Sequence, residues 1–430
     1  MNENLLEDQD EVGLYLDIII NQEKNRGNLF NYKNDEYIKK ITTFIDESIY
    51  LVLTEDDDIT KIYQHSEIES QKRKEEIILS IKKKPDNSFI LQNPMPGINI
   101  NPTENAVECL KKKLWYVVNS EDIKNPELKY NIINEDYYLN ENDIIKFGNL
   151  IYIVKKINIS NNDDSKDNDD SNKIGQNSIK SDRNYNIEEI NRKAEPIFNF
   201  YSSFEFEKCN FYDGIKAKLC KCDKFIEINC LKKLFNDCIQ RGRNVNIANF
   251  KLPNKLCEKC KTIFPLSFKL KEKEVDLINL LKLSEETKKM KKISNEKEIG
   301  NTENKDFNYI ILESLCHKED KSTKKFHVIT LSSINVINIG KKPFGDINKS
   351  LSKEHALIKN KNGKLHIKNI KGTFGTLVLI KNSLLINKKK INLQVGHILI
   401  EACLIKKKDF ILIQNDSKKY PLKKKKIIIK

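Results

Sequence analysis

Long apolar runs are missing from this sequence, and their absence limits where the protein can reside. No run reaches the roughly 18 apolar residues that a membrane-spanning helix needs. The opening residues, MNENLLEDQDEVG, are acidic and lack the apolar stretch of a secretory signal. We therefore expect an intracellular protein, cytoplasmic or nuclear, with no membrane partner. Thiols stay reduced inside cells, so disulfides are not expected either.

Arginine is also scarce, although 76 basic residues outweigh 62 acidic ones and give a net charge of +14. A surplus of positive charge attracts nucleic acids. Most of this charge is on lysine, however, which lacks the planar group with which arginine reads bases and holds phosphates. Nucleic-acid binding is therefore an alternative and not the expected function.

Cysteine is concentrated in one part of the chain. Seven of the ten cysteines lie between residues 209 and 260, and in a reducing compartment such clustering favours metal over disulfides. Cys220 and Cys222 form a C-x-C pair, and Cys257 and Cys260 form a C-x-x-C pair. Each pair can present two thiolates from one tight turn, so together they can hold one zinc ion in a tetrahedral site. The alternative is that they are buried, reduced cysteines.

Three segments differ in composition from the rest. Residues 161–186 contain almost no apolar side chains, and residues 283–306 form a charge run, so we expect disordered or partly helical linkers there. Residues 1–87 show mixed helical spacing, as in DEYIKKITTFIDESIYLVL, and we expect a partly helical extension.

The C-terminal part, residues 307–415, alternates short strand patterns with turns. Asn362 and Gly363 suit a type I′ turn, in which both residues need a positive φ, so HALIKNKNGKLHIKNI predicts a hairpin. Many short strands without intervening helices predict a β-sandwich.

The same region contains, in this order, Gly340, Ser352, His355, Gly375 and Thr376. These residues match the series Gly-Arg, then Ser-Arg-x-His, then Ser-x-Asn-Gly-Thr, and on this ground the region resembles a forkhead-associated (FHA) domain. The resemblance implies a C-terminal FHA β-sandwich whose loops bind phosphothreonine peptides.

The resemblance also assigns the residues of the phosphopeptide site. Lys341 and Lys353 stand where the family has arginines, and they supply charge without the bidentate fork. Ser352 keeps the family's hydroxyl donor, and Thr373 stands where a second hydroxyl often contacts the phosphothreonine. Phe374 replaces the asparagine that grips the peptide backbone. Two interpretations stay open: phosphopeptide binding, and docking of a partner without phosphate.

Ser352 and His355 do not suggest catalysis. A catalytic pair needs a third orienting group and an oxyanion site, and nothing near them in the sequence suggests either. In the family this histidine is structural and ties the binding loop to the sandwich. We therefore expect a protein that is not an enzyme.

The N-terminal part carries a weaker likeness to the same family. YYLNENDIIKFGNLIYIV resembles the last hairpin of FHA domains, with Asn142 in place of a glycine. Asparagine is the next most tolerant residue at positive φ. No Gly-Arg or Ser-x-x-His pair precedes this hairpin, so we expect an FHA-like β-domain that does not bind phosphate in the family's way.

The cysteine-rich middle resembles a RING-variant (RING-CH) zinc domain, which interleaves two zinc sites. The resemblance makes the two cysteine pairs named above one complete site. Its second site is broken, because Phe206 and Glu227 replace two ligands and leave Cys209 and Cys230. We therefore expect one structural zinc ion in a small α/β module. A second ion, for which Cys238 or Glu227 would complete the broken site, is the less favoured alternative.

A chain of 430 residues is long enough for two or three domains. The expected fold is mainly β, and the expected segments are 1–87 (mixed, partly helical extension), 88–158 (FHA-like β-domain), 159–195 (disordered linker), 196–268 (degenerate RING-variant zinc module), 269–306 (charged helical or disordered linker), 307–415 (FHA domain) and 416–430 (basic tail).

The function that these features predict is that of an adaptor, which binds protein partners through its C-terminal FHA domain while zinc holds the middle together. The partners include proteins that carry phosphothreonine. A RING-type ubiquitin ligase is one alternative, and a nucleic-acid-binding protein is another.

Overall fold

The computed structural model describes a large part of the chain. The described residues are 11–20, 39–53, 59–62, 76–93, 110, 113–118, 137–159, 206–208, 215–218, 222, 226–237, 240–241, 247–253, 257, 259–260, 264, 267–270, 273–276, 308–315, 323–331, 336–341, 350–370, 372–381, 383–386 and 390–419. The expected linkers at 161–186 and 283–306 lie outside them.

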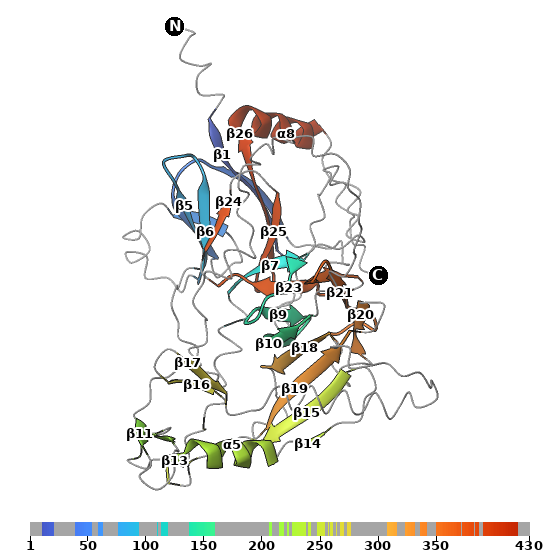
Figure 1. Cartoon of the computed structure of the whole chain (residues 1–430). Coiled ribbons are helices and arrows are strands. Elements are labelled where there is room, and N and C mark those ends of the chain that lie inside the picture. Colours follow the sequence, from blue (N-terminus) through green and yellow to red (C-terminus); the bar gives the residue numbers. More distant parts are fainter. Residues whose placement is uncertain are drawn as a thin grey trace, which may run out of the picture.

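One antiparallel sheet of twelve strands runs through the molecule (Figure 1). In spatial order its strands are β14 (Gln240–Arg241), β15 (Ile247–Pro253), β19 (Thr323–Thr330), β18 (Tyr309–Ser314), β10 (Leu150–Asn158), β9 (Ile144–Phe147), β23 (Thr376–Leu379), β7 (Leu114–Val118), β25 (Ile391–Val395), β26 (Ile398–Lys406), β1 (Val12–Ile20) and β2 (Lys39–Ile45). The expectation of a mainly β fold is confirmed.

Two smaller sheets contribute to the same apolar core as the long sheet. The first has the order β24 (Ser383–Ile386), β6 (Phe89–Gln92), β5 (Glu76–Lys83), β3 (Ile49–Leu53) and β4 (Ile59–Ile62). The second has the order β20 (Val336–Ile339), β21 (Ala356–Lys361), β22 (Lys364–Asn369) and β8 (Tyr137–Tyr138).

The middle of the chain adds short elements. A three-stranded sheet is formed by β11 (Phe206–Lys208), β12 (Ile215–Ala217) and β13 (Ile226–Glu227), and a two-stranded sheet by β16 (Ser267–Leu270) and β17 (Lys273–Asp276). Helix α5 (Ile228–Asp237) follows β13. The end of β16 and the whole of β17 fall in segment 269–306, which was expected to be helical or disordered, so its described residues are strands instead.

The expectation of a partly helical extension over residues 1–87 differs from the structure, because the described residues there form strands β1 to β5. In β1, Leu14, Leu16 and Ile18 are fully buried. Their spacing of two is that of a strand with one face on a core. Burial of this face outweighs the mixed periodicity of the segment as a whole.

The C-terminal helix α8 (Lys407–Lys419) extends into the expected basic tail, 416–430. Phe410 lies on this helix and stacks on Phe44 of β2 with ring centroids 5.4 Å apart. Among the residues that the structure describes, no helix has the length and apolar character needed to cross a membrane.

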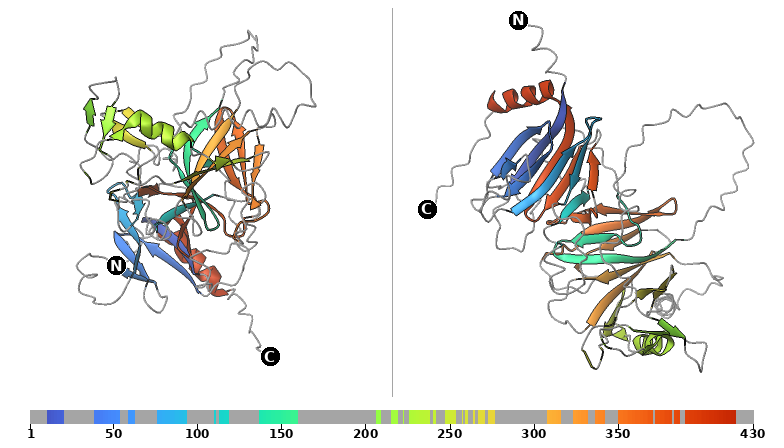
Figure 2. Two further views of the ribbon diagram at one scale, coloured as in Figure 1. Left: turned by 90° about the horizontal axis from the view of Figure 1, so that it is seen from below. Right: turned by 90° about the vertical axis from the view of Figure 1, so that its left-hand side faces the viewer.

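Strand pairing joins the expected segments 1–87 and 88–158 to the expected segment 307–415. Strands β8, β9 and β10 pair with β22, β23 and β18, and β24 and β26 pair with β6 and β1. The right-hand view of Figure 2 shows the red C-terminal strands beside the blue N-terminal ones. The sequence predicts strands in both regions but not these partners, because alternation defines the buried face of a strand and not its neighbour.

The predicted turn chemistry is confirmed. Asn362 and Gly363 have φ values of 53° and 73°, as a type I′ turn requires, and they join β21 to β22. Asn142 also has a positive φ, 69°, at the position where the resemblance has a glycine.

Candidate functional site

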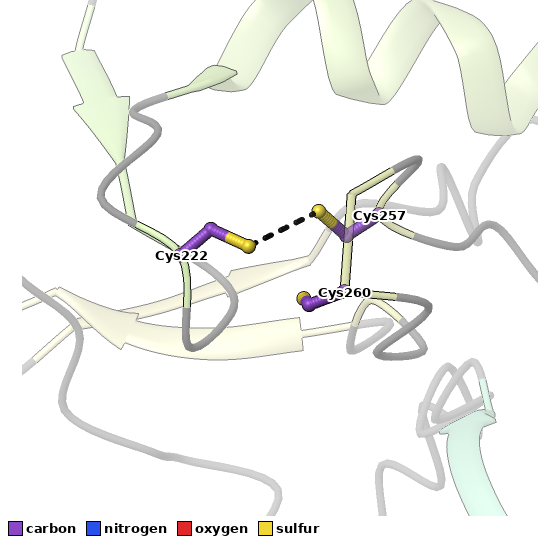
Figure 3. A group of neighbouring side chains, drawn as sticks. All are labelled: Cys222, Cys257 and Cys260. Carbon is purple, nitrogen blue, oxygen red and sulfur yellow. Dashed lines mark hydrogen bonds between the residues drawn. The ribbon is translucent and has the colours of Figure 1, made fainter.

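The first candidate site is a cluster of cysteines in the middle of the chain (Figure 3). The Sγ atoms of Cys222, Cys257 and Cys260 all lie within 4.8 Å of one another, and those of Cys222 and Cys257 are 4.0 Å apart. Two sulfurs that share a tetrahedral zinc ion, each about 2.3 Å from it, are about 3.8 Å apart. Three of the four predicted ligands are therefore close enough to bind one metal ion, and the fourth, Cys220, lies outside the described residues.

Two elements bring these thiols together. Cys222 follows β12, while Cys257 and Cys260 follow β15. Strand β15 pairs with β19 along its whole length, from Ile247 opposite Ile329 to Pro253 opposite Thr323. A metal ion in this cluster would thus fix the chain that leaves β15, which lies next to the edge strand β14 of the twelve-stranded sheet. Cys257 is 4% exposed, which suits a structural rather than a catalytic ion.

Cys230, which the RING-variant resemblance assigns to the broken second zinc site, lies beside the carboxylate of Glu227. The backbone N–H of Cys230 donates a hydrogen bond to Glu227 Oε2 at 3.2 Å. The same carboxylate raises the pKa of the exposed Cys230 thiol, because it hydrogen-bonds to the thiol and repels the thiolate. Within the described residues, the cluster of three cysteines is the one group with metal-binding spacing.

The second candidate site is a group of loops at one end of β20, β21 and β23. The backbone N–H of Lys341 donates to the carbonyl oxygen of Ser352 at 3.1 Å. Gly340 lies against Lys353, and a Cβ atom at this glycine would collide with the Lys353 carbonyl oxygen. Thr373 donates its N–H to Ser352 Oγ at 3.4 Å. The structure therefore places the predicted residues Lys341, Ser352, Lys353 and Thr373 on adjoining loops.

The buried side chain of His355 connects these loops through two hydrogen bonds. Its side chain is fully buried, and Nε2 lies 2.8 Å from the carbonyl oxygen of Gly375. The backbone N–H of Ser352 donates to Nδ1 at 3.3 Å. Because Nδ1 accepts, Nε2 must carry the proton and donate to Gly375. Both ring nitrogens are thus hydrogen-bonded to backbone atoms of two different loops.

Exposure separates the loop residues into two groups. Lys353 is exposed, and Lys341, Ser352 and Thr373 are half-buried, so these four can meet a ligand. Phe374 is only 7% exposed and belongs to the buried apolar residues. This phenylalanine therefore contributes to packing below the loops and not to their surface.

Sequence reasoning missed one contact of the loops. Asn149, in the turn between β9 and β10, donates its N–H to Ser350 Oγ at 2.9 Å. The two residues are 201 positions apart, and no local pattern predicts contact over such a separation.

Comparison of the chain with protein-family models, with curated proteins and with solved structures finds no match.

Proposed function

We propose that this protein is a non-enzymatic adaptor, which binds a phosphothreonine-containing partner through the loops that carry Lys341, Ser352, Lys353 and Thr373. The observation that carries the proposal is the position of Ser352. Its Oγ atom accepts a hydrogen bond from the N–H of Thr373, and among the described residues no acceptor takes its hydroxyl hydrogen, which can therefore be donated to a ligand. A phosphate monoester offers three strong acceptor oxygens for such a donor.

Charge on the loops supports the same ligand class. Lys341 and Lys353 flank Ser352 in space, because the 340–341 segment packs on the backbone of residues 352 and 353. Lysine attracts phosphate as a point charge, and hydrogen bonds between charged groups are roughly twice as strong as neutral ones. The expected ligand is therefore one phosphorylated side chain on an extended peptide.

The test uses the full chain and two matched peptide libraries, one with phosphothreonine and one with threonine at the fixed position. The proposal expects the phosphorylated library to be retained selectively. Equal retention of both libraries would instead support docking without phosphate, the other interpretation of the sequence. Retention of neither library would remove the peptide-binding proposal altogether.

The proposal includes one structural zinc ion, held by Cys222, Cys257 and Cys260 together with Cys220. Thiolates at tetrahedral spacing favour zinc over hard cations such as magnesium or calcium, which prefer oxygen. The ion would supply folding energy to the middle of the chain and would not take part in ligand binding.

A further inference from the structure

The centre of the twelve-stranded sheet has local twofold symmetry. Strands β7 and β23 pair antiparallel, with Tyr116 opposite Val378. On one side of this pair Leu377 lies opposite Val117, and on the other side Leu379 lies opposite Trp115. The order of strands is the same on both sides: β9, β10, β18 and β19 beyond β23, and β25, β26, β1 and β2 beyond β7.

The smaller sheets obey the same symmetry. The order β8, β22, β21 and β20 in one corresponds to the order β24, β6, β5 and β3 in the other. We call residues 11–159 the N-terminal half and residues 308–419 the C-terminal half. Three strands of each half are paired with strands of the other half. Strands β8, β9 and β10 lie among strands of the C-terminal half, while β24, β25 and β26 lie among strands of the N-terminal half.

Individual residues confirm the equivalence of the halves. Asn93 follows β6 and Asn369 ends β22, and both are buried, at 4% and 3% exposure. Asn93 Oδ1 accepts a hydrogen bond from the N–H of Leu114, at the start of β7. Asn369 Oδ1 accepts one from Thr376 Oγ1, at the start of β23. An asparagine side chain is thus hydrogen-bonded to the start of the equivalent strand in each half.

The exchanged strands reach the candidate ligand loops. Phe147 of β9 lies edge-on to the His355 ring at 5.8 Å between centroids. Asn149 donates to Ser350 Oγ, and a Cβ atom at Gly148 would lie 2.6 Å from the Ser350 carbonyl oxygen. The turn between β9 and β10 therefore fits closely under the loop that runs from Ser350 to His355.

We infer that the two halves exchange their last three strands within one chain, and that the exchanged β9–β10 hairpin positions the Ser350–His355 loop for its ligand. The strand exchange does not depend on the proposed function. Binding of a ligand by the Ser350–His355 loop does rest on the proposed function. In this arrangement the N-terminal half, which lacks the phosphate-binding motif, supplies the hairpin that positions the loop of the C-terminal site.

The exchange is tested by disulfide trapping in the full chain. Ser383 of β24 lies opposite Gln92 of β6, and directly paired residues of an antiparallel sheet have the Cα separation that a disulfide needs. Lys368 has the same place in β22 that Gln92 has in β6, since each directly precedes its equivalent asparagine. Ser383→Cys is therefore combined with Gln92→Cys, and in a matched control with Lys368→Cys.

Mild oxidation of the monomer should trap the 92–383 pair, identified by mass spectrometry of its linked peptides, and leave the 368–383 pair reduced. Trapping of the control pair instead would show that β24 lies in its own half and would overturn the inference. A 92–383 disulfide found only in covalent dimers would also overturn it, because the exchange would then join two chains. Neither result depends on phosphopeptide binding.

The positioning role is tested by two equivalent glycines. Gly148 and Gly396 have nearly the same positive φ, 58° and 56°, in the corresponding turns of the two hairpins. Among the described residues other than its chain neighbours, no atom lies within 4 Å of a Cβ built on Gly396, whereas one built on Gly148 meets Ser350. Gly148→Ala and Gly396→Ala therefore share backbone strain but differ in contact with the loop.

Amide hydrogen exchange of the full chain distinguishes the two variants. The N–H groups of Lys341 and His355, which bond to Ser352 and Ile339, report on the loop. Gly148→Ala should speed their exchange about tenfold or more, while Gly396→Ala should leave it near the wild-type rate. Equal effects of both variants on these two amides, or no effect of either, would overturn the positioning role.

Discussion

His355 donates a hydrogen bond from Nε2 to the carbonyl oxygen of Gly375, 2.8 Å away, from a ring that is fully buried. Substitution His355→Ala leaves this carbonyl and the N–H of Ser352 without their partner, and it opens a cavity. We expect the free energy of unfolding to fall by about 2–4 kcal/mol, measured by urea unfolding of the full chain. His397→Ala, at the half-exposed turn of the β25–β26 hairpin, serves as control, and a loss as large there would contradict the argument.

A second prediction concerns the cysteine cluster. The purified full chain should hold close to one zinc ion, and Cys257→Ser should abolish it, because a site with three thiolates binds far more weakly. Elemental analysis measures the ion. Loss of the ion should also speed amide exchange in β19, since β15 is hydrogen-bonded to that strand. Cys403→Ser, on β26, is the control and should keep the full zinc content.

The pH dependence of stability should carry a contribution from Asp143. Burial raises the pKa of this carboxyl, although Lys381 lies 3.8 Å away and Tyr137 and Asn140 donate hydrogen bonds to it. A carboxyl with a higher pKa folded than unfolded stabilises the fold below the unfolded value, and this contribution is lost as pH rises through the folded value. The stability of the wild type relative to Asp143→Asn should therefore fall as pH rises from about 4.

An exposed aspartate gives the matching control with the opposite sign. Ser88 donates hydrogen bonds to Asp86 from its hydroxyl and its N–H, and they lower the pKa of that carboxyl. The stability of the wild type relative to Asp86→Asn should then fall as pH drops through the folded pKa of Asp86. Urea unfolding at several pH values measures both variants, and slopes of the same sign would contradict the assignment.

Ligand binding gives a fourth prediction. If a phosphothreonine peptide binds the loops, Lys353→Ala should weaken it about tenfold or more, because a charge-assisted hydrogen bond is worth about 1.5–3 kcal/mol. Ser352→Ala should also weaken it. Lys361→Ala is the control, since this exposed lysine lies at the other end of β21. Fluorescence anisotropy with labelled peptide measures the affinities, and equal losses at Lys353 and Lys361 would point to unspecific charge.

The sequence predicts much of the local structure. Alternating apolar residues and the Asn362–Gly363 turn predict the β21–β22 hairpin, and both are found. The spacing of Cys222, Cys257 and Cys260 predicts a cluster that the structure brings within metal-binding distance. These features depend on residues close in sequence, or on chemistry that few arrangements satisfy.

The partners of the strands could not be predicted in the same way. Strand β26 consists mostly of apolar residues, but nothing in it identifies β1 as its neighbour. One signal was present in the sequence: FILQN, ending at Asn93, and LHIKN, ending at Asn369, share a pattern, as do IIKFGNLI and NLQVGHIL. Such short likenesses indicate equivalent strands, but they are the same whether the strands stay in their own half or change places.

The pairing of β1 with β26 has a consequence for synthesis on the ribosome. Glu11 and Lys407, which form an ion pair beside these strands, are 396 residues apart. At ordinary translation rates the second residue is made roughly 20 to 80 s after the first. Strands β8 to β10 precede all their C-terminal partners, whereas β1, β6 and β7 must wait for β26, β24 and β25. The half of the nascent chain that is translated first is therefore the half whose sheets are completed last.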